Sequence, residues 1–178
     1  KKTIKGCARG KALIDGLRYA LEKYPDANVF VEMDSDGAHS PEEIELGINL
    51  IANGADVAIG SKYLTGSKIK NRGAFRSLVS LVNTQLLQWV LKSDITDYSN
   101  GFRVYNLRAA KVAASHSFKF QTPIYLGEVL ALWIKNNLRV NEFPSTYSER
   151  EIGESKVLIS DVVEGLAGVA HIFKTMRG

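Results

Sequence analysis

The sequence predicts one α/β domain with a largely parallel sheet and helices on both of its faces. The first reason is that segments of strand character alternate with segments of helical periodicity along the whole chain. The second is length: 178 residues make one ordinary domain, and neither a repeat nor a linker divides them. The third is a composition of 45% hydrophobic and 24% charged residues, which is typical of folded proteins and excludes a disordered chain. We therefore expect residues 1–178 to form a single domain.

The beginning of the chain predicts a helix followed by a strand. Apolar side chains recur every three or four residues over 9–23, which predicts a helix that ends before Pro25. A run of β-prone residues at 28–33 follows and stops at Asp34. We expect a buried strand that leads into a polar loop.

A second helix and a second strand come next. Ser40 suits the N-cap of a helix, Pro41 suits its first position, and Glu43 can complete a capping box with Ser40. Gly54 then ends the helix. The apolar run at 55–59 predicts a short strand.

The remaining elements continue the alternation. A long apolar stripe predicts a helix over 74–91, and the last apolar segment predicts a helix over 156–175. Between these two helices we expect a strand at 102–105, helices at 107–115 and 124–136, and a strand at 138–143.

Charge and cysteine content exclude several classes of protein. The net charge is +4, from 23 Lys and Arg against 19 Asp and Glu, a mild excess that suits an anionic partner. The single cysteine, Cys7, excludes a disulfide within the chain. No segment reaches the roughly 20 consecutive apolar residues of a membrane-spanning helix.

Two carboxylates stand where the first predicted strand ends. Asp34 and Asp36 flank one serine, and ligand sites of α/β sheets lie at the carboxyl ends of strands. Paired carboxylates supply hard oxygen ligands for Mg²⁺ or Mn²⁺, which in turn binds a diphosphate. The alternative is a solvated turn, because Asp, Ser and Gly all favour turns. His39 is either a further ligand or a structural residue, and we leave it unassigned.

A cationic stretch follows the acidic segment. Between Val57 and Ser93 there is no Asp or Glu. The same window holds six basic residues: Lys62, Lys68, Lys70, Arg72, Arg76 and Lys92. Arg76, Ser80 and Asn83 are spaced to share one helix face, where a row of donors can bind a phosphate group; a solvated face explains Lys68 and Lys70 equally well. Aromatic and basic residues are not interleaved, so we expect no nucleic-acid partner.

Two later segments are also polar. Residues 97–103, from Asp97 to Arg103, are rich in turn-forming residues; they are either part of the site or an Asn-Gly turn followed by an edge strand. Arg150 and Lys156 lie in a loop before the last helix, where they could add to the anion ligands of the cationic stretch.

Together these motifs resemble glycosyltransferase family 2, and within it the group of polyprenyl-phosphate (dolichyl-phosphate mannose or glucose) synthases. Single motifs of this kind are weak, whereas eight in the same order over nearly the whole chain are specific. They are Gly10-Lys11-Ala12 with Gly16, Met33 to Asp36 with Ser40-Pro41-Glu42, Gly60-Ser61-Lys62-Tyr63, Arg76 with Ser80 and Asn83, Asp97 to Arg103, Glu128, Glu142 with Pro144, and Arg150 with Gly153, Ser155 and Lys156.

The chain departs from the family pattern in places. Lys62 stands where Arg is usual and lacks the bidentate fork of a guanidinium. Ala38 replaces a polar residue of the metal site of many relatives, and Asn100 replaces the commoner Ser. The family's first strands, which bind the nucleotide base, are absent before the helix at 9–23, so the chain resembles the domain without its N-terminal part.

The resemblance implies a GT-A fold, which is a Rossmann-like sheet, and an inverting transfer of a hexose to a polyprenyl or dolichyl phosphate. The implied donor is a nucleotide diphosphate sugar of the GDP-mannose or UDP-glucose type, with Mg²⁺ or Mn²⁺ held by Asp34 and Asp36. Asp36 and Arg76 are the implied catalytic residues. The implied substrate-binding residues are Asp34, Lys62, Arg76, Ser80, Asp97, Arg103, Glu128, Arg150 and Lys156. A lipid acceptor implies a peripheral position at the cytoplasmic face of a membrane.

The nature of the acceptor decides whether a base is needed. A phosphate is already ionised near neutral pH and needs no strong base, whereas a saccharide hydroxyl, the alternative acceptor, needs one. Asp97 and Glu128 are then the candidates, although Glu128 can equally be a buried structural partner in its apolar helix. We expect the last helix to pack on the domain; the alternative places it at a membrane interface, with Lys156, Lys174 and Arg177 near the headgroups.

Two further alternatives remain open. The sequence Asp-x-Asp-Gly after a strand also suggests a haloacid-dehalogenase-type phosphatase, with Asp34 as nucleophile and Asp36 as acid, but the second acidic pair of that fold is not found. The other alternative is a non-catalytic or degenerate fragment that binds sugar nucleotides, which Ala38 and the missing first strands favour.

Overall fold

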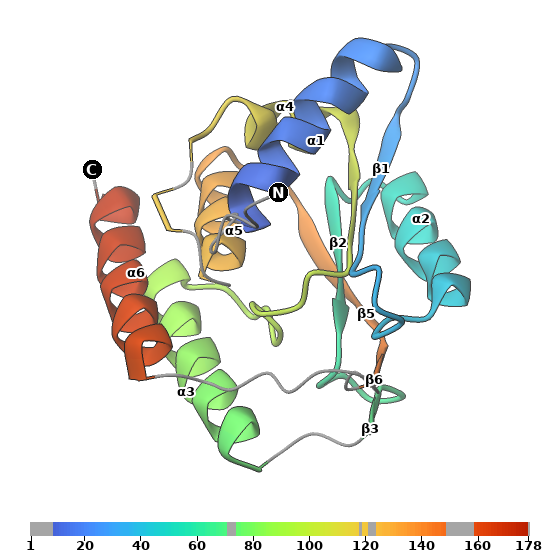
Figure 1. The fold of residues 1–178 in the computed structure, drawn as a ribbon. Helices are drawn as coiled ribbons and strands as arrows, with labels where there is room; N and C mark the ends of the chain where they lie inside the picture. Colours follow the sequence, from blue (N-terminus) through green and yellow to red (C-terminus); the bar gives the residue numbers. More distant parts are fainter. Residues whose placement is uncertain (1–8, 71–73, 118, 121–123, 149–158, 178) are drawn as a thin grey trace, which may run out of the picture.

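A computed structural model describes residues 9–70, 74–117, 119–120, 124–148 and 159–177. Figure 1 shows a twisted sheet with helices on both faces, so the predicted α/β class is confirmed. Within the described ranges the central sheet has the order β1–β4–β2–β5. In that order the strands are Val29–Glu32, Arg103–Asn106, Val57–Ser61 and Val140–Pro144.

The central sheet is mixed rather than largely parallel. β2 and β5 run parallel, but β4 runs antiparallel to both β1 and β2. The expectation of a largely parallel sheet is therefore wrong for the described strands, and so is the alternative that placed β4 at an edge. The cause is the connection before β4, which enters the sheet at the end where β1 and β2 leave it. Hydrophobic periodicity reports burial and not direction, so it carried no signal for this reversal.

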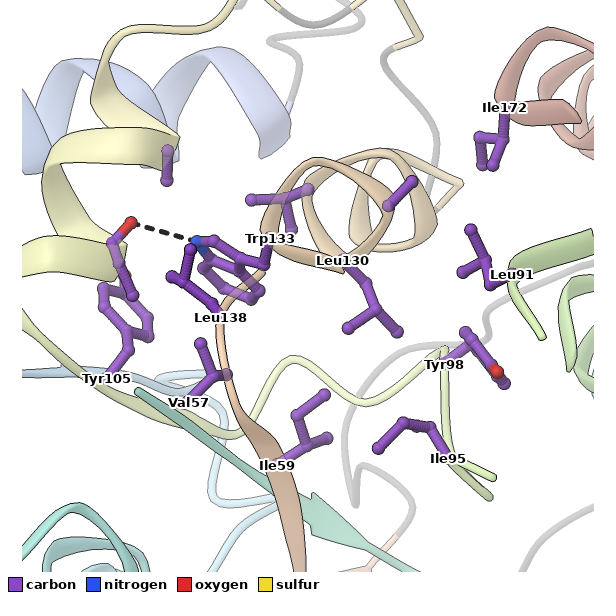
Figure 2. Packing of buried hydrophobic residues seen from close by; sticks show 14 of the residues in the cluster. Val57, Ile59, Leu91, Ile95, Tyr98, Tyr105, Leu130, Trp133, Leu138 and Ile172 are labelled. Carbon is purple, nitrogen blue, oxygen red and sulfur yellow. Dashed lines mark hydrogen bonds between the residues drawn. The ribbon is translucent and has the colours of Figure 1, made fainter. Parts of the chain in front are cut away.

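One face of the sheet is covered by α1 (Arg9–Lys23), α4 (Leu107–Ala114) and α5 (Tyr125–Lys135). Figure 2 shows the core beneath them, where Val57 and Tyr105 of the sheet meet Leu130 and Trp133 of α5. The indole N–H of Trp133 donates to the carbonyl of Ala109 at 2.9 Å, which satisfies the polar end of this fully buried ring.

The opposite face is covered by α2 (Ile44–Ala52), which packs on Val104 and Phe143. A Cβ atom at Gly47 would lie 2.5 Å from the Val104 side chain, so this glycine permits the close approach of helix and sheet. The predicted capping box is wrong: a 3₁₀ turn at Pro41–Glu43 precedes α2, and Ser40 makes no capping bond.

The remaining elements are two packed helices and two short strands outside the central sheet. α3 (Ala74–Leu91) packs against α6 (Ile159–Arg177), and α6 also packs against α5, as expected for a last helix that docks on the domain. Two short strands that the sequence did not predict, β3 (Lys68–Lys70) and β6 (Thr146–Ser148), form a small parallel sheet near the end of the central one. None of the helices in the described ranges is both long and apolar enough to cross a membrane.

Candidate functional site

Several polar loops meet at one end of the central sheet. β1 and β2 end there, and because β4 is antiparallel to both, the loop that leads into β4 begins at the same end. The loop after β1 spans residues 33–39 and carries the predicted metal ligands; we call it the donor loop. The loop before β4 spans residues 96–101, and a Cβ atom added at Gly101 would lie 4.0 Å from Oδ1 of Asp34. The two loops are thus direct neighbours.

The donor loop has a defined shape that leaves its carboxylates near solvent. Asp34 is half-buried and Asp36 is exposed. Oδ1 of Asp36 accepts a hydrogen bond from the backbone N–H of Ala38 at 3.1 Å, and Gly37 adopts a φ of +77° within this turn. The backbone N–H of Asp34 donates to Nδ1 of His39 at 3.4 Å.

His39 lies in the interior of the site. It is 4% exposed, and its ring stacks on Phe102 with centroids 5.3 Å apart. Burial lowers the pKa of its imidazole below the ordinary value, which keeps the ring neutral and Nδ1 able to accept. Its backbone forms a bridge with Tyr147 of β6. The sequence left this residue unassigned because a loop histidine gives no sign of its burial.

The loop before β4 is built around a buried ion pair between Lys62 and Asp97. Nζ of Lys62 lies 2.5 Å from Oδ2 of Asp97, and the two side chains are 4% and 0% exposed. Oδ1 of Asp97 accepts from the backbone N–H and the hydroxyl of Ser99 at 3.2 and 3.1 Å. The resemblance implied that Lys62 and Asp97 bind substrate; in the structure the two side chains form an ion pair with each other.

Glu142 of β5 binds the start of the loop before β4. Its carboxylate accepts the backbone N–H groups of Thr96 and Asp97 at 2.8 and 2.9 Å, and the Thr96 hydroxyl at 3.0 Å. Burial raises the pKa of Glu142. A charged acceptor of three hydrogen bonds fixes where the loop starts.

Arg103 is fully buried at the beginning of β4, and this differs from the implied substrate contact. Its guanidinium donates to the carbonyls of Asn100, Tyr98 and Leu126 at 3.1 to 3.3 Å. Arg103 therefore ties the loop before β4 to α5, which makes it a support of the site.

Glu32 ends β1 directly opposite Arg103 in the strand register. The hydroxyl of Tyr125 donates to Oε1 of Glu32 at 3.2 Å. Burial raises the pKa of Glu32 to about 7, and the charge of Arg103 opposes that rise only in part. Oε2 of Glu32 and Nη1 of Arg103 have no hydrogen-bond partner among the described residues.

Glu128 lies in the first turn of α5. It is buried and accepts the backbone N–H groups of Lys119 and Phe120 at 3.2 and 3.3 Å. His116 and His171 approach Oε1 at 3.8 and 3.7 Å. This environment agrees with the alternative in which Glu128 is a buried structural partner.

The other predicted residues are only partly described. Arg76, Ser80 and Asn83 lie within α3, so their spacing on a helix is confirmed, but their side chains fall outside the described part of the structure. Arg150, Lys156 and Cys7 lie outside the described residues altogether.

The donor loop fits a divalent cation that a substrate completes. In the described part of the chain, no group of three or more His, Cys, Asp or Glu side chains is placed to hold a metal ion. Mg²⁺ is commonly bound through one or two carboxylates together with substrate phosphates and water. The carboxylates of Asp34 and Asp36 meet that requirement, with the remaining positions left to a diphosphate and water.

The model of the family described as "Glycosyl transferase family 2" matches residues 5–112. The match spans both polar loops and the strands that carry them. The chain belongs to glycosyl transferase family 2. This confirms the family that the motifs indicated, and the mixed sheet with helices on both faces is consistent with the GT-A architecture of that family.

Relatives of known activity narrow the group within family 2. The chain is 32% identical over 165 residues to polyprenol monophosphomannose synthase of Mycolicibacterium smegmatis, which covers 91% of this chain and 60% of that protein. It is 33% identical over 167 residues to undecaprenyl-phosphate mannosyltransferase of Micrococcus luteus, covering 91% and 65%. It is 34% identical over 158 residues to dolichol-phosphate mannosyltransferase of Pyrococcus furiosus, covering 87% and 42%. The chain thus spans less than two thirds of the length of each of these relatives.

Proposed function

We propose that the protein transfers a hexose from a nucleotide diphosphate sugar to a polyprenyl phosphate. The observation that carries the proposal is the donor loop: two carboxylates stay near solvent at the end of the sheet, in a family 2 chain similar to polyprenyl-phosphate mannosyltransferases. The donor is of the GDP-mannose or UDP-glucose type.

Asp34 and Asp36 bind the donor diphosphate through Mg²⁺ or Mn²⁺ in this proposal. A divalent ion held by Asp34 and Asp36 would supply positive charge that stabilises the leaving diphosphate. The donor loop supplies the two carboxylates on a backbone that the turn at Gly37 and the bond to His39 hold in place. The acceptor phosphate is bound and oriented by Arg76 and Ser80 on α3 together with Arg150 and Lys156. In-line attack by this phosphate inverts the configuration at the anomeric carbon.

The hydrogen bonds and ion pair that engage Asp97 and Glu128 favour a phosphate acceptor over a saccharide hydroxyl. A hydroxyl needs a base, and the sequence offered Asp97 and Glu128. Asp97 is paired with Lys62, and Glu128 accepts two backbone N–H groups on α5. Neither carboxylate is available to take a proton from an acceptor, whereas a phosphate attacks in its ionised form.

The first test is an assay of the full-length protein with Mn²⁺, polyprenyl phosphate and either GDP-mannose or UDP-glucose. We expect a lipid-linked hexose with one of the donors. Asp36→Ala should reduce turnover by a factor on the order of 10²–10³ or more, because it removes charge stabilisation from the leaving group. Asp15→Ala, which removes an exposed carboxylate on α1, is the matched control and should leave turnover unchanged. Full turnover in Asp36→Ala, or transfer to a saccharide hydroxyl alone, would contradict the proposal.

We also propose that the α3–α6 pair lies against a membrane surface. Trp89 on α3 is 70% exposed and stacks on Phe173 of α6 at 5.7 Å, and the Arg177 guanidinium lies 4.0 Å from the Phe173 ring centroid. Leu81, Val82 and Leu166 are further exposed apolar side chains on these two helices. Exposed tryptophan beside basic residues suits the interface of an anionic bilayer.

Vesicle binding tests this surface. Trp89→Ala should weaken binding of the full-length protein to vesicles of anionic phospholipid about three- to tenfold, because the aromatic anchor is lost. Tyr19→Ala removes an aromatic side chain from α1 that is 61% exposed, and it is the control. Equal loss of binding in both variants would show that α3 and α6 are not the contact, and the assay separates this point from sugar transfer.

A further inference from the structure

We infer that His39 is a positioning residue for the donor loop: its Nδ1 atom holds the backbone of Asp34, and so sets where the first of the two carboxylates lies. The inference rests on the proposed role of Asp34 and Asp36 in binding a metal diphosphate. It goes beyond that role because it assigns a task to a residue other than the two carboxylates.

The contact itself is the first reason. Nδ1 of His39 accepts the backbone N–H of Asp34 at 3.4 Å. A ring nitrogen accepts only when it carries no proton, so the ring is the neutral tautomer with its proton on Nε2. Without this acceptor, the N–H of Asp34 would have to find water or another partner, and the loop would change shape.

The second reason is that the ring cannot easily move. Phe102 lies against one side at 5.3 Å and Tyr147 lies 6.0 Å away at 60°. The backbone on both sides of the ring is also fixed, since the N–H of Ser148 donates to the carbonyl of Ala38 at 3.0 Å and His39 bridges to Tyr147. An acceptor held this firmly transmits its position to the residue that it binds.

The third reason is the other ring nitrogen. Nε2 is buried and has no hydrogen-bond partner among the described residues. A buried unpaired donor is destabilising, so an apolar ring would serve packing alone better than a histidine. The hydrogen bond to a ring nitrogen is the one from Asp34, with the Asn100 side chain also acting on the ring, and this favours Nδ1 as a reason for a histidine here.

Three variants separate the atoms of the ring. His39→Asn keeps an acceptor near the Nδ1 position, His39→Gln places its polar atoms near the Nε2 position, and His39→Phe keeps a stacking ring with no acceptor. The measurement is Mn²⁺ binding to the full-length protein by electron paramagnetic resonance, with GDP and then with UDP as the diphosphate. His116→Asn is the matched control, because this histidine lies beside Glu128 and outside the donor loop.

We expect His39→Phe to bind Mn²⁺ about tenfold more weakly and His39→Asn to stay within about threefold of the wild type, since one hydrogen bond contributes about 1.4 kcal/mol or less. The KM for the sugar donor should rise in the same order, with the KM for polyprenyl phosphate unchanged. Full Mn²⁺ affinity in His39→Phe would overturn the inference, and so would rescue by His39→Gln rather than His39→Asn. Urea unfolding of each variant shows that it is folded.

The outcome is distinct from that of the sugar-transfer assay. If the wild type binds Mn²⁺ with a nucleoside diphosphate but transfers no sugar, the proposed reaction is wrong and the order of the His39 variants still decides the inference. If the wild type binds no Mn²⁺ with GDP or UDP, the inference is overturned together with the metal role of Asp34 and Asp36.

Discussion

The two polar loops at the end of the sheet use the same residue types in opposite ways. In the loop before β4, Asp97 is 0% exposed and its carboxylate binds Lys62 and Ser99. In the donor loop, Asp34 is half-buried and Asp36 is exposed. One loop uses its charge to hold its own shape, and the other keeps its charge near solvent. A ligand can recruit only the second kind without first breaking the fold.

This difference teaches how a site of this family is divided. The loop before β4 is held by the charged side chains of Lys62, Arg103 and Glu142, through an ion pair and hydrogen bonds. It lies directly beside the donor loop. Buried charges stay in a protein only when they are paired and hydrogen-bonded. Residues that follow the family pattern can therefore serve the site by building its frame rather than by binding substrate.

The strongest test of the comparison removes one carboxylate from each loop. Asp97→Ala leaves the ammonium of Lys62 buried without a counter-charge and should lower the free energy of unfolding by about 3–5 kcal/mol. Asp34→Ala should change it by no more than about 0.5 kcal/mol, because that side chain lies near solvent. Urea denaturation measures both. Equal losses in the two variants would show that the loops do not differ as described.

A second test concerns Glu32, which lies between the two loops. Its pKa rises from the ordinary 4.5 to about 7 in the folded protein, so the folded state binds this proton more tightly than the unfolded state. The stability linked to Glu32 is therefore present below pH 4.5 and is lost as the pH rises to 7. Glu32→Gln should remove that loss and gain about 1–3 kcal/mol at pH 8 relative to wild type, with little gain at pH 4. If the unfolding free energies of the wild type and Glu32→Gln change with pH in parallel, this prediction is wrong.

The smallest expected effect comes from Glu142. Glu142→Gln keeps one acceptor but turns an amide N–H₂ toward backbone donors, and it should cost about 1–2 kcal/mol of unfolding free energy. Asn141→Ala, at an exposed position of the same strand, is the control and should cost less than about 0.5 kcal/mol. Thermal or urea unfolding distinguishes the two. No difference between them would mean that Glu142 does not secure the loop before β4.

Much of the fold could be predicted from periodicity. The helix over 74–91 has the predicted limits, and the helix over 9–23 does as well, because each has a long apolar stripe at helical spacing. The direction of β4 and the strands β3 and β6 could not be predicted. Direction depends on where a connection crosses the sheet, and strands of three residues are too short to show a period.

The candidate site was predictable in residue types but less so in roles. Asp34 and Asp36 follow a buried strand, and their position in the fold agrees with the sequence pattern. Lys62 and Asp97 lie 35 residues apart, and no local pattern shows that they form one buried pair. Glu43 was assigned to a capping box, but its carboxylate accepts the backbone N–H of Thr146 instead, a partner 103 residues away. Contacts at such separations follow from the tertiary fold alone.

The strand order β1–β4–β2–β5 also has a consequence for how the molecule comes together. No neighbours in this sheet are consecutive strands of the described chain, so none of its pairs can form as a hairpin. The chain must close long loops before any two strands of the sheet can pair, and such topologies fold slowly. The donor loop reaches its neighbours only when β4 has entered between β1 and β2. A chain still emerging from the ribosome therefore carries both aspartates well before the neighbouring loop that completes their surroundings is in place.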